Sequence, residues 1–432
     1  MSRHSMLVVL CVFLAVVTVA AQTVPSNGNL VFAIPGLYGP NGLVLPNPFH
    51  SAHFNSSFQE NFSPLNSELG TALTRLPLAS PASGFVYTFD KSLGVWNQSS
   101  QSFGPILSER SETIGRRKLF VAFGYQYFGF STLDGVDLHN LPAVFGHQET
   151  NPSPAYEADY ITTSNDIDLS INQFTIFGTY GLTNRLDVSV AIPFEQTNLN
   201  VTSKAHIVRI APPSPVFGQF HYFDSNDPQN SIDKVFSSSN SAAGIGDVIF
   251  RGKFSAWKGE RAGLAVGLDV RVPSGDAMNF LGSGATGIRP FAAFSYRARV
   301  SPHLNAGYEW NGDSILAGNV LTGTKGKLPD AFLYAGGVDV GINKRASAVF
   351  DIVGQVTLDT EQIAVTTFTA SNGSQAPTFI ITKGNVPITS ASLGLKVNPW
   401  KSLLLNGNIL IKLNDAGLRA TVVPYVSVSY TF

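Results

Sequence analysis

Apolar and polar residues alternate along most of the chain after residue 118. In residues 185–197, every second position from Leu186 to Phe194 is apolar, and residues 263–273 repeat this pattern with two charged residues on the polar face. Successive side chains of a strand point to opposite faces, so a period of two predicts strands with one apolar and one polar face. About twelve segments of this kind follow one another from residue 119 to the C-terminus.

The connections between these segments alternate in length. Short turns are expected at residues 181–184, 257–261, 301–303, 342–344 and 399–401. Longer loops are expected at residues 132–166, 202–244, 274–287, 312–329 and 357–387. Such alternation predicts an up-and-down antiparallel sheet with an even number of strands. The first strand then begins, and the last strand ends, on the side that carries the short turns.

The first residues have the pattern of an export signal. Arg3 and His4 precede an apolar run over residues 6–19, and small residues precede Gln22. We expect a signal peptide over residues 1–21, because the run is too short to favour a membrane-spanning helix. The single cysteine, Cys11, lies within it. The exported chain then has no cysteine for a disulfide, a thiolate metal site or a nucleophile.

The composition indicates that the predicted sheet forms a barrel in a membrane. Charged residues make up 13% of the chain, against roughly 25% in ordinary soluble domains. The mean hydropathy is slightly positive, at +0.12, yet no apolar run after the leader approaches the length of a membrane helix. A chain of this kind satisfies its backbone in lipid by closing its strands into a barrel. The net charge of −1 gives no indication of a nucleic-acid partner.

The fold class predicted is therefore an all-β, transmembrane, antiparallel up-and-down barrel over residues 119–432, with about twelve strands. Residues 22–118 differ, because nine prolines are expected to interrupt any long regular element there. A small hairpin over residues 85–97 is expected, and adding its two strands to the barrel would give fourteen. The segment is either a periplasmic extension or a plug in the lumen.

The first strand is apolar on both faces. Phe120, Phe128 and Phe130 point opposite to the residues expected to face lipid. An inward apolar face needs something to pack against, and we expect either residues 22–118 or an apolar solute to supply it.

Charged residues on the inner faces define the candidate solute path. The side chains expected to project inward near mid-depth are Arg251, Asp269, Arg271, Glu309 and Asp351. Inward residues of one hairpin pair with each other, so Arg251 is expected opposite or diagonal to Asp269. The alternative is that these charges only solvate the lumen and pair among themselves. Mixed signs argue against strong selection of anions or cations, and twelve strands indicate a narrow, passive conduit.

Several motifs resemble a known family. They are residues 180–188 (YGLTNRLDV), 244–247 (GIGD), 269–276 (DVRVPSGD) and 305–310 (NAGYEW). In this order they resemble outer-membrane proteins assigned as transporters of the phenol meta-degradation pathway, over roughly residues 119–432. The terminal Phe432 likewise resembles the last residue of bacterial outer-membrane barrels, where it helps the assembly machinery to recognise the chain.

The resemblance implies a bacterial outer-membrane location, with lipid, the assembly machinery and a small-molecule solute as partners. It implies uptake of small solutes, aromatic or hydrophobic ones included, without a cofactor. The oligomeric state stays open.

Two other functions fit the same barrel. A structural or adhesive protein would act through its long outer loops, and a lipid hydrolase would need a nucleophile with a positioned base, for which His206 and His221 are the nearest histidines. Metal binding is not predicted. His50 and His53 lack a supporting carboxylate or cysteine cluster. Asp137, His139, His147 and Glu149 are a better metal candidate, and the alternative for them is a solvated loop.

Overall fold

The computed structural model describes residues 28–39, 42–48, 50–74, 76–77, 87–90, 95–98, 102–147, 158–214 and 218–432. The predicted signal peptide and Glu149 lie outside these residues. No helix in the described part of the chain combines the length and the apolar character needed to cross a membrane.

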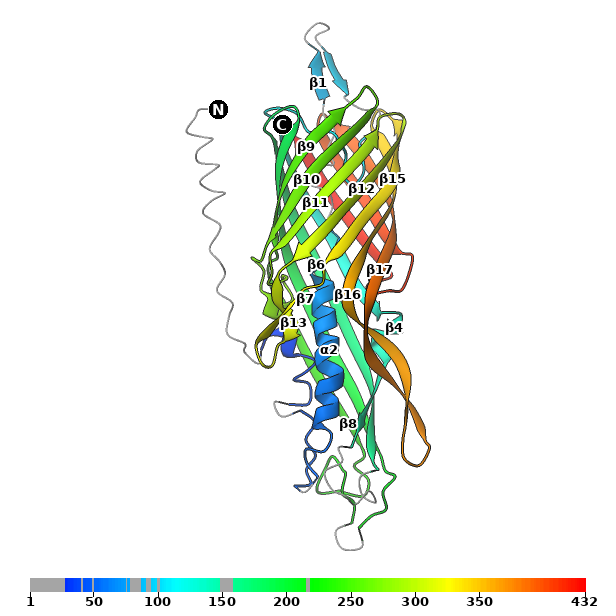
Figure 1. Ribbon diagram of the computed structural model, residues 1–432. Helices are drawn as coiled ribbons and strands as arrows, with labels where there is room; N and C mark the ends of the chain where they lie inside the picture. The colour runs from blue at the N-terminus through cyan, green and yellow to red at the C-terminus, as the bar shows by residue number, and fades with distance from the viewer. Residues whose placement is uncertain are drawn as a thin grey trace.

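Twelve antiparallel strands close into a barrel, as the sequence predicts (Figure 1). The barrel closes because β3 pairs with β6 on one side and with β20 on the other. In chain order the strands are β3 (Leu119–Leu133), β6 (Tyr160–Gly181), β7 (Leu186–Val208), β9 (Val248–Lys258), β10 (Ala262–Val272), β11 (Gly287–Tyr296), β12 (Val300–Asn311), β15 (Ala331–Asn343), β16 (Ala346–Thr369), β17 (Gln375–Trp400), β18 (Leu403–Lys412) and β20 (Val422–Thr431).

Short turns lie at the end of the barrel that holds the C-terminus, at the top of Figure 1. They comprise residues 182–185, 259–261, 297–299, 344–345 and 401–402. Outer-membrane barrels have their short turns on the periplasmic side, so we assign this end of the barrel as the periplasmic end. The third turn was predicted at residues 301–303 and this was wrong. β12 begins at Val300, and the backbone amide of Arg297 donates to the Arg261 carbonyl, which extends the previous pairing.

Two of the predicted long outer loops, at residues 202–244 and 357–387, contain long strand segments. β16 and β17 pair from Ala346↔Val397 to Thr369↔Gln375 around a turn at residues 370–374, and β7 pairs with β8 (Asp233–Ile245) beyond the barrel body. These hairpins lie at the bottom of Figure 1. Outside the membrane neither face meets lipid, so the sequence is rich in serine, threonine and asparagine on both faces and lacks the alternation that predicts a strand.

The remaining elements are short. β4 (Val136–Asp137), β5 (Leu141–Gly146), β8 and β19 (Leu418–Ala420) extend the barrel sheet, and β13 (Asp313–Asn319) pairs with β14 (Thr324–Lys327). β1 (Tyr87–Asp90) and β2 (Val95–Gln98) form a separate hairpin, so they do not raise the strand number to fourteen. The 3-10 turns are η1 (Leu30–Phe32), η2 (Leu138–Asn140) and η4 (Ala277–Asn279).

An apolar band covers the exterior of the barrel. On β20, Val422, Val426 and Val428 are exposed, whereas Val423 and Tyr425 between them are buried. Other strands add exposed residues to this band, among them Phe123, Phe174, Val266, Leu304, Phe350 and Leu393. Exposed Trp257, Trp400 and Phe432 mark the periplasmic end, and Trp310 lies at the outer end of β12. This is the apolar belt with aromatic borders that lipid requires.

Helix α2 (Asn55–Leu73) begins shortly after residue 50 and lies at the outer mouth, in the lower half of Figure 1. It packs against β5, β13, β16, β17 and β19. Phe62, Leu65, Leu69 and Leu73 recur on one face and are buried. The expectation that prolines exclude a long element here was wrong. Pro64 lies inside the helix, and burial of this face outweighs its lost backbone hydrogen bond.

Candidate functional site in the barrel lumen

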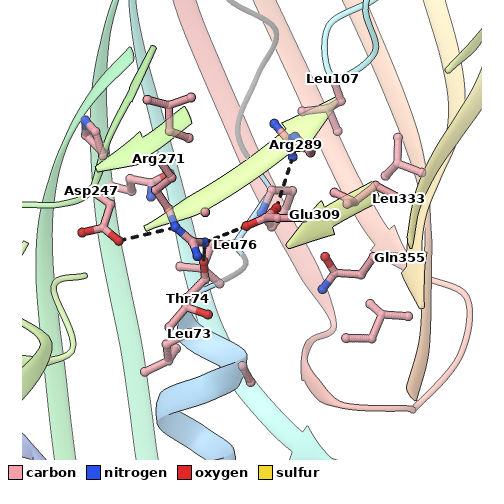
Figure 2. Close-up of a pocket in the computed structure, with 18 of the residues that line it drawn as sticks. Leu73, Thr74, Leu76, Leu107, Asp247, Arg271, Arg289, Glu309, Leu333 and Gln355 are labelled. Atoms are coloured by element: carbon pink, nitrogen blue, oxygen red, sulfur yellow. Dashed lines mark hydrogen bonds and ion pairs between the residues drawn. The ribbon is translucent and has the colours of Figure 1, made fainter. Parts of the chain in front are cut away.

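The lumen holds a cavity of 330 Å³. The end of α2 and the residues after it close its outer side, through Leu73, Thr74 and Leu76. Leu107 reaches it from the segment that precedes β3 (Figure 2), and Glu109 of the same segment also lines it. Between these two parts of the N-terminal region, strands from all round the barrel form the wall.

One wall of the cavity is charged and internally paired. Asp269 lies directly opposite Arg251 in the β9–β10 register. Arg251 donates to both Asp269 oxygens, from Nε at 2.6 Å and from a terminal nitrogen at 2.8 Å. Arg289 on β11 donates to the same carboxylate from its Nε at 3.0 Å. Two guanidinium groups therefore share one buried carboxylate, which fixes all three side chains.

Arg271 connects this wall to the end of the helix. Its guanidinium lies 3.1 Å from Glu309 and 3.7 Å from Asp247, and it donates to the Thr74 carbonyl at 3.1 Å (Figure 2). Arg289 lies 3.9 Å from the other Glu309 oxygen. The orphan carbonyl at the C-terminal end of α2 thus meets a cation, the charge that the helix dipole favours there.

The opposite wall is mainly apolar, although Lys412 and Arg419, which adjoin its apolar residues in sequence, also line the cavity. Phe128 and Phe130 stack with ring centroids 6.0 Å apart, and both line the cavity. Other apolar lining residues are Val353, Leu410, Leu418, Ala420 and Val423. Phe120, by contrast, is buried nearer the periplasmic end, in a cluster with Ile114 and Phe177. The cavity can therefore hold a molecule with one apolar and one polar side.

The segment over residues 102–118 is tied to the inner wall by buried charges. Glu109 accepts from Lys253 Nζ at 2.9 Å and also from Arg251. Arg110 lies 3.0 Å from Asp339 on β15. These ion pairs hold the segment across the periplasmic half of the lumen.

A lysine on β17 adds an attachment of a different kind. Lys396 is fully buried and donates to the Pro105 carbonyl at 2.6 Å and to the Phe103 carbonyl at 3.3 Å. Two backbone carbonyls of the segment thus accept from this ammonium group.

Asp351 lies apart from the cavity. It accepts from His303 Nε2 at 2.6 Å, and the other ring nitrogen of His303 lies 3.4 Å from Asp339. Both aspartates and the histidine are almost fully buried. Of the five predicted lumen residues, the structure therefore brings Arg251, Asp269, Arg271 and Glu309 together around the cavity and places Asp351 in a neighbouring cluster.

Sequence reasoning missed the contribution of Glu109 and Arg110. A signal was available in Lys253 and Lys396, whose charges fall on inward faces and need partners when buried. Nothing in the spacing of residues 102–118 connects them to particular strands. The pairing therefore had to come from the structure.

Within the described part of the chain, each of the two histidines considered for a hydrolase pairs with an aspartate. His206 pairs with Asp233 at 2.7 Å, and His221 pairs with Asp159 at 2.7 Å. Burial raises the pKa of the Asp159 carboxyl, but hydrogen bonds from His221 and two backbone amides outweigh it and hold that pKa below its ordinary value.

The closed barrel with its lipid-facing belt and lined lumen defines a channel-like protein of the bacterial outer-membrane class. A family model described as "Putative MetA-pathway of phenol degradation" matches residues 164–325. The chain therefore resembles this family, as its motifs indicate. No curated protein matches the chain.

Three solved structures are similar to this chain at low sequence identity. An outer membrane channel from Pseudomonas putida F1 is 12% identical, with a TM-score of 0.44 over 75% of this chain and 99% of that chain. The NanC porin is 10% identical, with a TM-score of 0.31 over 72% and 98%. A FadL homologue of Pseudomonas aeruginosa is 8% identical, with a TM-score of 0.31 over 74% and 90%.

Proposed function

We propose that this protein is a passive channel for small, largely apolar solutes, aromatic ones included. The observation that carries the proposal is the lumen cavity, with its apolar wall on one side and its charge-paired wall on the other. A solute would enter by diffusion, with its apolar part against Phe128 and Phe130 and a polar group toward Arg289.

The size and charge of the cavity support this solute class. An apolar cavity of about 150 Å³ holds benzene, so 330 Å³ leaves room for a single ring with a substituent. The carboxylates on the charged wall are matched by guanidinium groups at short distances. A fully ionic solute would have to break such pairs, whereas a neutral or weakly polar one would not.

We further propose that residues 22–118 act as a plug, with residues 119–432 as the barrel. Helix α2 would close the outer side of the cavity and residues 102–118 the periplasmic side. Displacement of the second part would open the path. Cleavage after residue 21, recognition of Phe432 by the assembly machinery and uptake of phenol-type compounds belong to the same proposal.

A structural or adhesive role is the second candidate. It is favoured by the hairpins β6–β7 and β16–β17, because β16 and β17 have 24 and 26 residues, whereas about 9–11 residues span the membrane. A protein of this kind would show no solute flux. We propose no catalytic activity.

Selective flux tests the solute class. In a liposome swelling assay with the full chain, a phenyl glycoside should enter faster than a methyl glycoside, and Phe128→Ala should lower the ratio of the two rates about two- to tenfold. This range corresponds to the 0.5–1.5 kcal/mol that an aromatic contact contributes. Both solutes are too polar to cross lipid unaided at a comparable rate.

Phe123→Ala is the matched control, since Phe123 lies on the same strand with its side chain 55% exposed on the lipid side. The ratio should not change in this variant. Equal rates for the two solutes in the unaltered protein would refute an apolar path. Absence of flux for both, with and without residues 22–118, would favour the structural role.

A further inference from the structure

Four histidines from three separate parts of the chain meet at the outer end of the molecule. His50 and His53 precede α2, His147 follows β5, and His221 lies in the connection between β7 and β8. One ring nitrogen of each lies within 4.8 Å of those of the other three. Neither of the two histidine groupings considered from the sequence contains this set.

The separations suit a tetrahedral ion. With metal–nitrogen bonds of about 2.0–2.1 Å, neighbouring ligand nitrogens lie about 3.3 Å apart and the ring centroids about 5 Å apart. The six centroid distances here run from 4.5 to 6.5 Å. His53 Nδ1 and His147 Nε2 are 2.8 Å apart, so these two would separate by about half an ångström to share an ion.

His221 has the features of a prepared ligand. Its Nδ1 lies 2.7 Å from Asp159 Oδ2, and Asp159 also accepts from the backbone amides of Ile210 and Ala211. Its Nε2 is buried and has no hydrogen-bond partner among the residues that the structure describes. A carboxylate on the far nitrogen fixes the tautomer that leaves Nε2 with a lone pair, an arrangement common to metal-bound histidine. This unsatisfied nitrogen is the second, independent indication of a ligand.

The surroundings would hold an ion in place and limit water. Phe54 packs edge-on against His147 and His221, with both centroid distances at 5.3 Å. Phe220 lies 4.5 Å from the ring of His50. The other two histidines of the outer region lie elsewhere, each paired with its own aspartate, His139 with Asp166 and His206 with Asp233.

We propose that His50, His53, His147 and His221 bind one divalent transition-metal ion of the zinc type. Four neutral imidazoles form a site for Zn²⁺, Co²⁺, Ni²⁺ or Cu²⁺ and a poor one for Mg²⁺ or Ca²⁺, which prefer oxygen. The ion would join the residues just before α2 to two outer connections of the barrel. It would thereby anchor the N-terminal region at the outer mouth, and it is independent of the solute path.

Metal titration of the full chain tests this site. Protein without a polyhistidine tag is treated with a chelator, and Zn²⁺ is then added in competition with a chromophoric chelator. We expect one ion per chain, with affinity lowered more than a hundredfold in the His53→Ala/His147→Ala double variant. Asp159→Asn should weaken binding about ten- to a hundredfold, as loss of such carboxylate partners does. Co²⁺ should give the intense visible bands of tetrahedral coordination.

The matched control is His139→Ala/His206→Ala, which removes two outer histidines outside the cluster and should leave affinity and spectrum unchanged. His53→Gln/His147→Gln, which keeps side-chain bulk, guards against misfolding, and heat-modifiable migration in gels checks the barrel. Sub-stoichiometric binding of Zn²⁺, octahedral Co²⁺ bands, or an equal loss of Zn²⁺ affinity in the control and cluster variants would each overturn the proposal.

Discussion

Removing residues 22–118 while keeping the signal sequence should raise single-channel conductance about tenfold or more. In the proposed plug, α2 closes the outer side of the cavity and residues 102–118 close the periplasmic side. Without them the inward charges face water, which solvates them, and a twelve-stranded wall encloses a continuous aqueous path. Planar bilayer recording of the shortened and full-length proteins measures the difference directly.

The full-length protein from the same preparation is the control, and heat-modifiable migration shows whether the shortened barrel has folded. A folded, shortened barrel whose conductance equals that of the full chain would contradict the plug. Residues 22–118 would then not obstruct the path through the barrel.

Glu109→Gln should release residues 102–118 from the barrel wall. The Glu109 carboxylate is the shared partner of Lys253 and Arg251, and all three side chains are buried. Breaking a buried ion pair on one side costs about 3–5 kcal/mol. Arg251 keeps Asp269, so we expect the lower end of that range, which corresponds to a shift of about a hundredfold toward the open form. Open probability in bilayer recordings should rise accordingly.

Glu112→Gln is the matched control in the same segment. Its carboxylate lies 3.4 Å from Arg297, and both side chains are about one quarter exposed, at 27% and 22%. An ion pair of this kind contributes at most about 1 kcal/mol. Open probability should change by no more than a few fold, and identical behaviour of the two variants would argue against a role for the buried pair.

The barrel could be predicted from sequence because lipid imposes the strictest pattern. Where one face of a strand meets lipid, as from Leu186 to Phe194, the alternation is complete. Where both faces of a strand lie outside the membrane, as in β8 and the outer part of β16, this constraint ends, and the sequence there predicts loops instead of strands. α2 was missed because the rule against proline in helices was weighed more than the spacing of Phe62, Leu65 and Leu69.

The candidate site followed from sequence only where local register determines it. Arg251 and Asp269 belong to one hairpin, so their pairing follows from the turn between β9 and β10. Glu109 meets Lys253 across 144 positions of sequence, and the four histidines come from three segments. Contacts of this kind depend on how the N-terminal region packs against the barrel. The local alternation of apolar and polar residues does not indicate this packing.

A reversible disulfide between residues 102–118 and the barrel wall tests most directly whether this segment controls the passage of solute. Ser111 and Ser295 have their Oγ atoms 3.1 Å apart, one in the segment and one on β11. In Ser111→Cys/Ser295→Cys, oxidation should join the two, and each single-cysteine variant serves as a control. We predict that glycoside flux into liposomes falls at least about tenfold on oxidation and returns when the bond is reduced. Equal flux through the oxidised and reduced forms, with the bond verified, would contradict a channel opened by movement of residues 102–118.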